Sequence, residues 1–174
     1  GLRVAEQLAA WQMTVPLHAL LSRLAVHRGA LHEAAGHLQT AEQLIASGVT
    51  SASEGLWWAK GMLQEARGQD AAALGTLAGL IEQLPRRLLL FANEPNAAPA
   101  LVRLAQRAGA SDLAAAVAAA IRRLAAANPE VPSVTGAATH ATGLLHRDRR
   151  RLLTAVADLR ASPGPLALAS ALED

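Results

Sequence analysis

The sequence predicts an all-α fold: a right-handed superhelix of antiparallel helical hairpins, with about four repeats and part of a fifth. Ala and Leu, both strong helix formers, supply most of the apolar residues, and few stretches alternate in the manner of strands. Turn residues recur at spacings of 39, 41 and 39 residues, at Gly29, Gly68, Gly109 and Asp148. Such a period is typical of α-solenoids, whose units bury their apolar faces against neighbouring units. We therefore expect a single helical-repeat domain over residues 1–174, a fragment of a larger multidomain protein.

The first unit is expected over residues 14–48. Its first helix carries four leucines spaced i, i+3, i+4 and i+7, which predicts a buried stripe. Gly29 ends that helix, because glycine readily takes positive φ. A second apolar stripe follows and closes at Ser47-Gly48. The residues of the two stripes are Leu17, Leu20, Leu21 and Leu24, and then Leu31, Ala34, Ala35, Leu38, Ala41 and Ile45.

The second unit, residues 53–84, contains the pair Trp57-Trp58 in its first helix. Neighbouring helical residues point about 100° apart, so one ring can fill the core while the other is at least partly exposed. We assign Trp57 to the core and Trp58 to the surface. The second helix starts after Gly68 and carries an apolar stripe of Leu74, Leu77, Ile81 and Leu84.

The second half of the chain continues the pattern. Residues 85–91 predict a short buried helix, and 93–99 predict a loop because Pro95 and Pro99 disfavour helix before them. The remaining units are expected at 99–128, where Ser111 would cap the second helix, and at 133–161. A truncated helix occupies 165–174.

Composition excludes several classes of protein. No cysteine is present, which excludes disulfides and thiolate metal sites, and the longest apolar run, Leu113–Ile121, is far too short to span a membrane. The pI near 10.3 does not indicate a strongly basic protein, since the net charge is only +2. It is high because, with one Lys and no Tyr or Cys, almost no group titrates between His and Arg. We expect a cytoplasmic protein that neither enters membranes nor binds nucleic acid directly.

Candidate chemical motifs are weak. His32 and His37 are five residues apart, which turns them about 140° from each other on a helix and disfavours a shared metal ion. The basic run of His146, Arg147 and 149–151 has no aromatic side chain to stack on bases, so it is a solvated turn or a contact for an acidic partner. No paired carboxylates, nucleophile elbow or P-loop is present. We therefore expect no enzyme activity, cofactor or metal.

A binding surface is the more reasonable expectation. An exposed Trp58 would suit a protein contact, and the guanidiniums of Arg86 and Arg87 could hold a carboxylate or phosphate. These three residues are our candidates for a partner or effector surface, although Arg86 and Arg87 also fit a solvated helix end.

Two resemblances refine this view. The second unit resembles a stretched tetratricopeptide repeat, with matches at Trp57, Gly61, Ala73, Leu77 and Pro85. Residues 95–174 resemble more closely the helical-repeat region of large ATP-binding LuxR-type bacterial transcriptional regulators. The matching segments are Pro99–Arg103, Gly109, Asn128–Ser133, Ala138–Asp148, Gly164–Leu166 and Ala169–Asp174.

The second resemblance implies a non-catalytic sensor domain. It would bind an inducer or partner protein on its concave face and relay this to an ATPase module and a helix-turn-helix DNA-binding module, both absent from this chain. A repeat scaffold unrelated to transcription and a small-molecule-binding helical domain are the alternatives. The apolar truncated ends also suggest self-association end to end.

Overall fold

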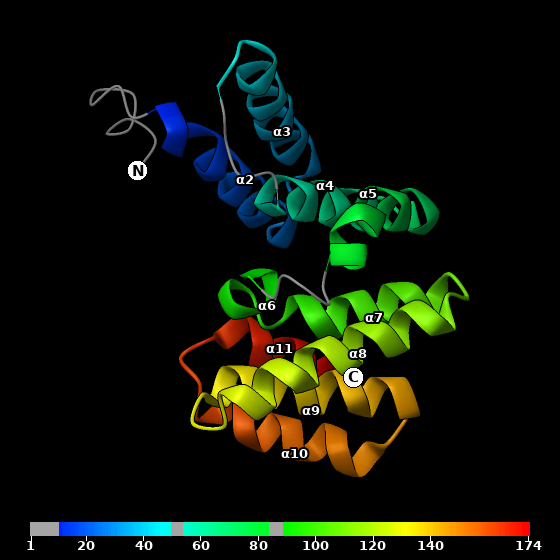
Figure 1. The fold of residues 1–174 in the computed structure, drawn as a ribbon. Coiled ribbons are helices and arrows are strands. Elements are labelled where there is room, and N and C mark those ends of the chain that lie inside the picture. The colour runs from blue at the N-terminus through cyan, green and yellow to red at the C-terminus, as the bar shows by residue number, and fades with distance from the viewer. Residues whose placement is uncertain (1–10, 50–53, 84–88) are drawn as a thin grey trace. The chain divides into compact units, whose positions relative to one another are not determined.

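The computed structural model describes residues 11–49, 54–83 and 89–174, and every regular element in these ranges is an α-helix (Figure 1). The all-α prediction is therefore confirmed for this part of the chain. The chain divides into two compact units, Gly1–Leu80 and Ile81–Asp174. None of the described helices is both long enough and apolar enough to cross a membrane.

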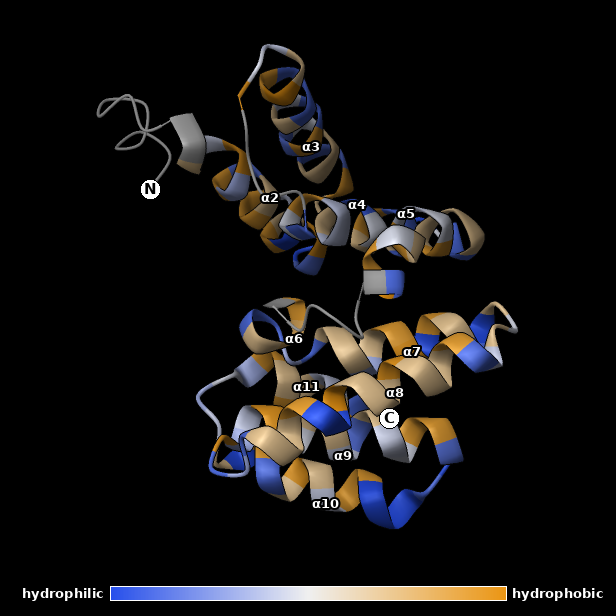
Figure 2. Ribbon diagram, in the orientation of Figure 1, coloured by the Kyte–Doolittle hydropathy of each residue, from blue (hydrophilic) through white to orange (hydrophobic). Residues whose placement is uncertain are grey.

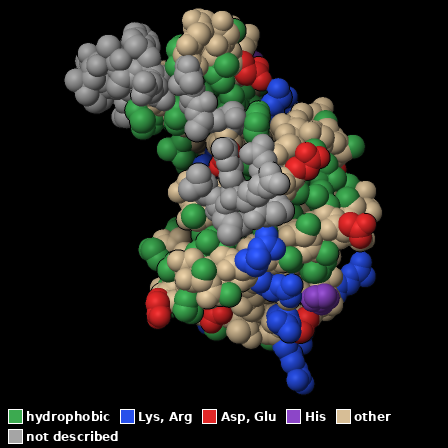
Figure 3. Space-filling view, viewed as in Figure 1, with side chains coloured by type: hydrophobic (Ala, Val, Ile, Leu, Met, Phe, Trp, Pro, Cys, Tyr) green, Lys and Arg blue, Asp and Glu red, His purple; other side chains and the backbone are tan. Residues whose placement is uncertain are grey.

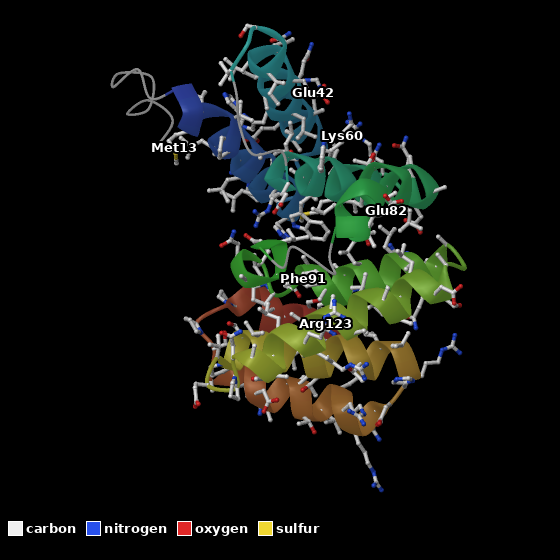
Figure 4. The ribbon with its side chains drawn as sticks, viewed as in Figure 1. Met13, Glu42, Lys60, Glu82, Phe91 and Arg123 are labelled. Carbon is white, nitrogen blue, oxygen red and sulfur yellow. The ribbon has the colours of Figure 1, made fainter. Side chains whose placement is uncertain are left out.

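Unit 1 contains α2 (Trp11–His27), α3 (Leu31–Ala46), α4 (Glu54–Ala66) and most of α5 (Asp70–Gln83). Helix α2 packs against both α3 and α4, and α3 also contacts α4. Gly29 and Gly68 form the predicted turns with φ of 73° and 71°, where an L side chain would be strained. An ion pair between Lys60 of α4 and Glu42 of α3, 2.9 Å long, links two of these helices on the surface (Figure 4).

The predicted stripe of α2 is wrong. Leu20 and Leu24 are 43 % and 47 % exposed, and the helix instead buries Thr14, Val15, His18, Ala19, Ser22 and Ala25. These side chains are mostly smaller than leucine, so α3 and α4 can approach the helix closely. On α3 the prediction is confirmed at Ala34, Leu38 and Ala41, which are buried, whereas Ile45 is 39 % exposed.

The assignment of the two tryptophans is also wrong. Trp58 is buried, with 6 % of its surface exposed, whereas Trp57 is half-buried. The buried face of α4 runs through Leu56, Ala59 and Leu63. Helix α4 also buries Gly61, three residues after Trp58, so a second side of the helix is covered and Trp58 belongs to that side.

Unit 2 contains α6 (Leu89–Asn93), α7 (Ala97–Arg107), α8 (Ser111–Ala127), α9 (Pro132–His146), α10 (Arg149–Arg160) and α11 (Pro165–Glu173). Each helix from α7 onward packs against the next, and α7 also packs against α9. Phe91 of α6 is fully buried, as expected for the short helix over 85–91 (Figure 4). Residues 85–88 of that predicted helix lie outside the described residues.

Two local predictions in unit 2 fail. Pro99 lies inside the first turn of α7 and is buried, so the preceding loop is shorter than expected. A proline is tolerated there because the first amides of a helix have no acceptor within the helix. Ser111 is the first residue of α8 and makes no capping bond, while Ala110 occupies the cap position.

Helices α9 and α10 approach closely because α9 presents glycine at the contact. A Cβ on Gly136 would lie 2.7 Å from Cγ of Leu159, and one on Gly143 would lie 2.8 Å from Cδ2 of Leu152. The same Cβ on Gly143 would also lie 3.2 Å from the backbone N of Leu152, and a backbone atom cannot move aside as the end of a side chain can. This pair of glycines therefore sets the separation of the two helices.

Candidate functional site

Two neighbouring turns of unit 2 bring basic side chains together. The Nε2 of Gln106, near the end of α7, donates a hydrogen bond of 3.0 Å to the carbonyl oxygen of Leu144, near the end of α9. The α7–α8 and α9–α10 turns are therefore neighbours. Together they carry five exposed arginines, which we call the basic edge: Arg107, Arg147, Arg149, Arg150 and Arg151.

The α9–α10 turn is built by its own sequence. Arg147 takes the left-handed conformation with φ of 52°, which ends α9 as a glycine does at the other hairpin turns. Asp148 then caps α10 by accepting hydrogen bonds from the backbone N–H groups of Arg150 and Arg151, at 3.0 and 3.3 Å. The predicted turn and its acidic cap are confirmed.

Asp148 stays ionised in this position. Its pKa is lowered, chiefly because the backbone N–H of Arg151 donates to the carboxylate, with a further backbone bond from Arg150. The guanidinium of Arg151 also contacts it, with Nε 3.2 Å from Oδ2. One carboxylate therefore serves both as helix cap and as counter-charge to Arg151.

The charges at the start of α10 are opposite to those usually found at the N-terminus of a helix. An acidic residue stands in the first turn of α3, α4, α5 and α8, where it complements the positive end of the helix dipole. Helix α10 has none there and begins with three arginines. Figure 2 shows this turn and the start of α10 as hydrophilic, and Figure 3 shows several Lys and Arg side chains close together on the face of unit 2 that is in view.

A buried polar cluster lies between α7, α9 and the C-terminal end of α11. His140 is fully buried, and its Nε2 donates to Oδ2 of Asp174 at 2.7 Å, since an ionised carboxylate can only accept. Arg103 contacts the same carboxylate through Nη1 and donates through Nη2 to Oγ of Ser170 at 3.0 Å. The cluster joins three helices through one carboxylate.

His140 is held neutral in this cluster. Its pKa is lowered, first by burial, which penalises the charged imidazolium, and also by the charge of Arg103; Asp174 opposes both effects. Its Nδ1 is buried without a hydrogen-bond partner among the described residues.

Only one of the three site residues expected from the sequence lies in the described part of the chain. Trp58, proposed as an exposed contact, is buried in the core, so the reason for choosing it disappears. Arg86 and Arg87 lie outside the described residues. Sequence reasoning weighed the arginines after residue 146 but missed Arg107. The 40-residue spacing between Arg107 and Arg147 could have placed them on equivalent turns.

Comparison with models of protein families, with curated proteins and with solved structures finds no match to this chain. The functional argument therefore rests on the residues of the chain itself.

Proposed function

We propose that this chain is a non-catalytic interaction domain that binds an acidic surface of a partner protein through the basic edge. The domain would belong to the sensor region of a bacterial transcriptional regulator of the LuxR type, as the resemblance over residues 95–174 implies. Partner binding would be relayed to ATPase and DNA-binding modules elsewhere in the full protein.

One observation carries the proposal: five exposed arginines share two adjacent turns, while Asp112 and Asp148 are the carboxylates of the same turns. A guanidinium presents planar donors that match a carboxylate in bidentate fashion. None of the basic-edge residues is aromatic, so the edge offers no aromatic ring to stack on a nucleic-acid base. This composition favours a polypeptide rich in Asp and Glu over DNA.

A solenoid architecture is part of the proposal. Within unit 2 each helix packs on the next and α7 packs on α9, which is the order of contacts expected when helical hairpins stack. Unit 1 shows the same order in α2, α3 and α4. A tetratricopeptide-like superhelix would present successive turns along one edge, which suits recognition of an extended acidic segment.

Charge substitution with a matched control tests the proposed surface. Poly-L-glutamate labelled with a fluorophore serves as the probe at low salt, and binding is followed by anisotropy. The double variant Arg149→Ala/Arg150→Ala should weaken binding about tenfold or more, since charge-assisted hydrogen bonds are lost. The control is Arg122→Ala/Arg123→Ala, which removes the same charge from exposed positions about 16 Å or more along α8.

Equal weakening in the two double variants would contradict a localised site and indicate net-charge attraction only. Sequence-specific retardation of duplex DNA by the chain alone would contradict the choice of an acidic polypeptide. The regulator assignment has a separate test, the coding sequence around this segment. A P-loop upstream and a helix-turn-helix downstream are expected, and their absence would leave the alternative of a repeat scaffold unrelated to transcription.

A further inference from the structure

Two histidines of unit 1 face each other across the α2–α3 hairpin. Nδ1 of His18 lies 3.1 Å from Nδ1 of His37, and the two ring centroids are 5.3 Å apart with the rings tilted by 49°. His18 is 7 % exposed, and the side chain of His37 is 23 % exposed. The sequence pairs His37 with His32, but the fold pairs it with a residue 19 positions earlier.

The separation of the two nitrogens suits ligation of one ion. A tetrahedral zinc ion bound at 2.0–2.1 Å holds two nitrogen ligands about 3.3 Å apart. The observed 3.1 Å is close to this value. Without an ion, one imidazole must carry its proton on Nδ1 and donate it to the other, so the pair is a hydrogen bond or a metal site, and other features decide between them.

On the Nε2 side of its ring, away from His18, His37 has the kind of neighbours that orient a metal-bound histidine. Oε1 of Glu33 lies 3.9 Å from Nε2 of His37, and Glu33 is itself held by Arg28 through contacts of 2.7 and 2.8 Å. A carboxylate on this side favours the proton on Nε2, which leaves the lone pair of Nδ1 available. Metal-bound histidines are commonly oriented by a carboxylate in this way.

Two buried hydroxyls flank the pair. Thr14 and Ser22 lie one helical turn before and after His18 and are 3 % and 0 % exposed. Within the part of the chain that the structure describes, their oxygens have no hydrogen-bond partner. Helical threonines elsewhere in the chain bond the carbonyl four residues back, among them Thr40, Thr139, Thr142 and Thr154. A buried hydroxyl without a partner indicates that a water or ion belongs nearby. Hydroxyls within about 6 Å of His18 could bind water molecules on a metal ion.

We propose that His18 and His37 bind a first-row transition-metal ion, such as Zn²⁺ or Cu²⁺, through their Nδ1 atoms, with water in the remaining positions. Imidazole nitrogen selects these ions over Mg²⁺ and Ca²⁺, which prefer oxygen. Among the described residues no group of three or more His, Asp and Glu side chains could hold a metal ion, so the proposed ligand set is these two imidazoles and water. The ion would join α2 to α3 directly and so stabilise the first hairpin. This inference is independent of the proposed function.

Calorimetric titration of the 174-residue chain with ZnCl2, in a buffer that does not bind metal, is the first test. One ion per chain is expected, with no saturable binding of Mg²⁺. His37→Ala should abolish the binding, and Glu33→Gln should weaken it about tenfold through loss of the outer-shell carboxylate. His32→Ala is the matched control, because His32 is an exposed histidine on the same helix, and it should leave the binding unchanged.

Imidazole ¹⁵N spectra of the unsubstituted protein decide the question even if a variant fails to fold. Zinc should shift the Nδ1 resonances of both His18 and His37 and remove any Nδ1–H signal from the pair. Persistence of that Nδ1–H signal at saturating zinc would overturn the proposal and leave a simple hydrogen bond. Equal loss of binding in His32→Ala and His37→Ala would overturn it as well.

Discussion

Both units bury a histidine in the first helix of a hairpin, but the two imidazoles have different hydrogen-bond partners. In unit 2, His140 donates to the carboxylate of Asp174, which also binds Arg103, so the chain supplies every charge that the cluster needs. In unit 1, the imidazole of His18 faces the imidazole of His37, and their two Nδ1 atoms lie next to each other without a carboxylate between them. In unit 2 one carboxylate pairs with both the imidazole and the guanidinium, although Nδ1 of His140 has no hydrogen-bond partner among the described residues. The pair in unit 1 instead needs a proton or an ion between its two Nδ1 atoms.

The two units also differ in their large buried side chains, and the largest expected effect concerns unit 1. Trp58→Ala should lower the free energy of unfolding by about 3 kcal/mol, because a buried indole leaves a cavity. Trp57→Ala should cost clearly less, because that ring is half-buried. Urea unfolding followed by circular dichroism compares the two variants, and a greater loss from Trp57→Ala would contradict the packing of α4.

Replacing a glycine by alanine should have opposite effects on stability in the two units. Gly143→Ala in unit 2 should cost about 2 kcal/mol, because the new methyl group would meet both the side chain and the backbone of Leu152. Gly79→Ala in unit 1 should instead stabilise the protein by about 1 kcal/mol, because α5 gains helix propensity and nothing lies within 4 Å. Thermal unfolding of the two variants checks the opposite signs; stabilisation by Gly143→Ala would refute the close approach of α9 and α10.

Removing the shared carboxylate of unit 2 tests the buried cluster. Asp174→Asn should lower the free energy of unfolding by about 2 kcal/mol, because Arg103 and His140 both lose a charged acceptor. Glu173→Gln is the control, since it removes the same charge from the neighbouring exposed residue and should change stability by less than about 0.5 kcal/mol. Hydrogen exchange should show the loss of protection concentrated in α11, and protection that is unchanged there would count against the cluster.

The smallest effect is a dependence on pH. The pKa of His140 is lowered from 6.5 in the folded protein, so below pH 6.5 the unfolded chain binds a proton that the folded chain does not. Stability should therefore fall as the pH is lowered from 7 through 6.5 towards the folded pKa. His140→Gln should flatten this slope in urea unfolding, whereas His32→Gln, an exposed control, should leave it unchanged. An unaltered slope in His140→Gln would show that His140 is not the residue responsible.

Much of the secondary structure could be predicted from residue order alone. Glycine is favoured wherever the chain needs positive φ at a helix end, and Gly29, Gly68 and Gly109 take it with φ of 71–73°. The cap at Asp148 follows for the same local reason, because a short acidic side chain reaches the free amides that begin a helix. These outcomes depend on neighbours within a few residues, so sequence patterns predict them well.

Tertiary packing decided which helix faces are buried and which distant side chains meet, and local sequence patterns do not predict either. The leucine spacing of α2 predicts the wrong buried face, because small side chains allow closer contact with two neighbouring helices than a row of leucines would. The basic edge depends on Gln106 meeting the end of α9, and the buried clusters join His18 to His37 and His140 to Asp174. Those partners are 19 to 38 residues apart in sequence. Helix propensity and turn chemistry act over a few residues, whereas such pairings depend on how whole helices cross, and no local pattern specifies that.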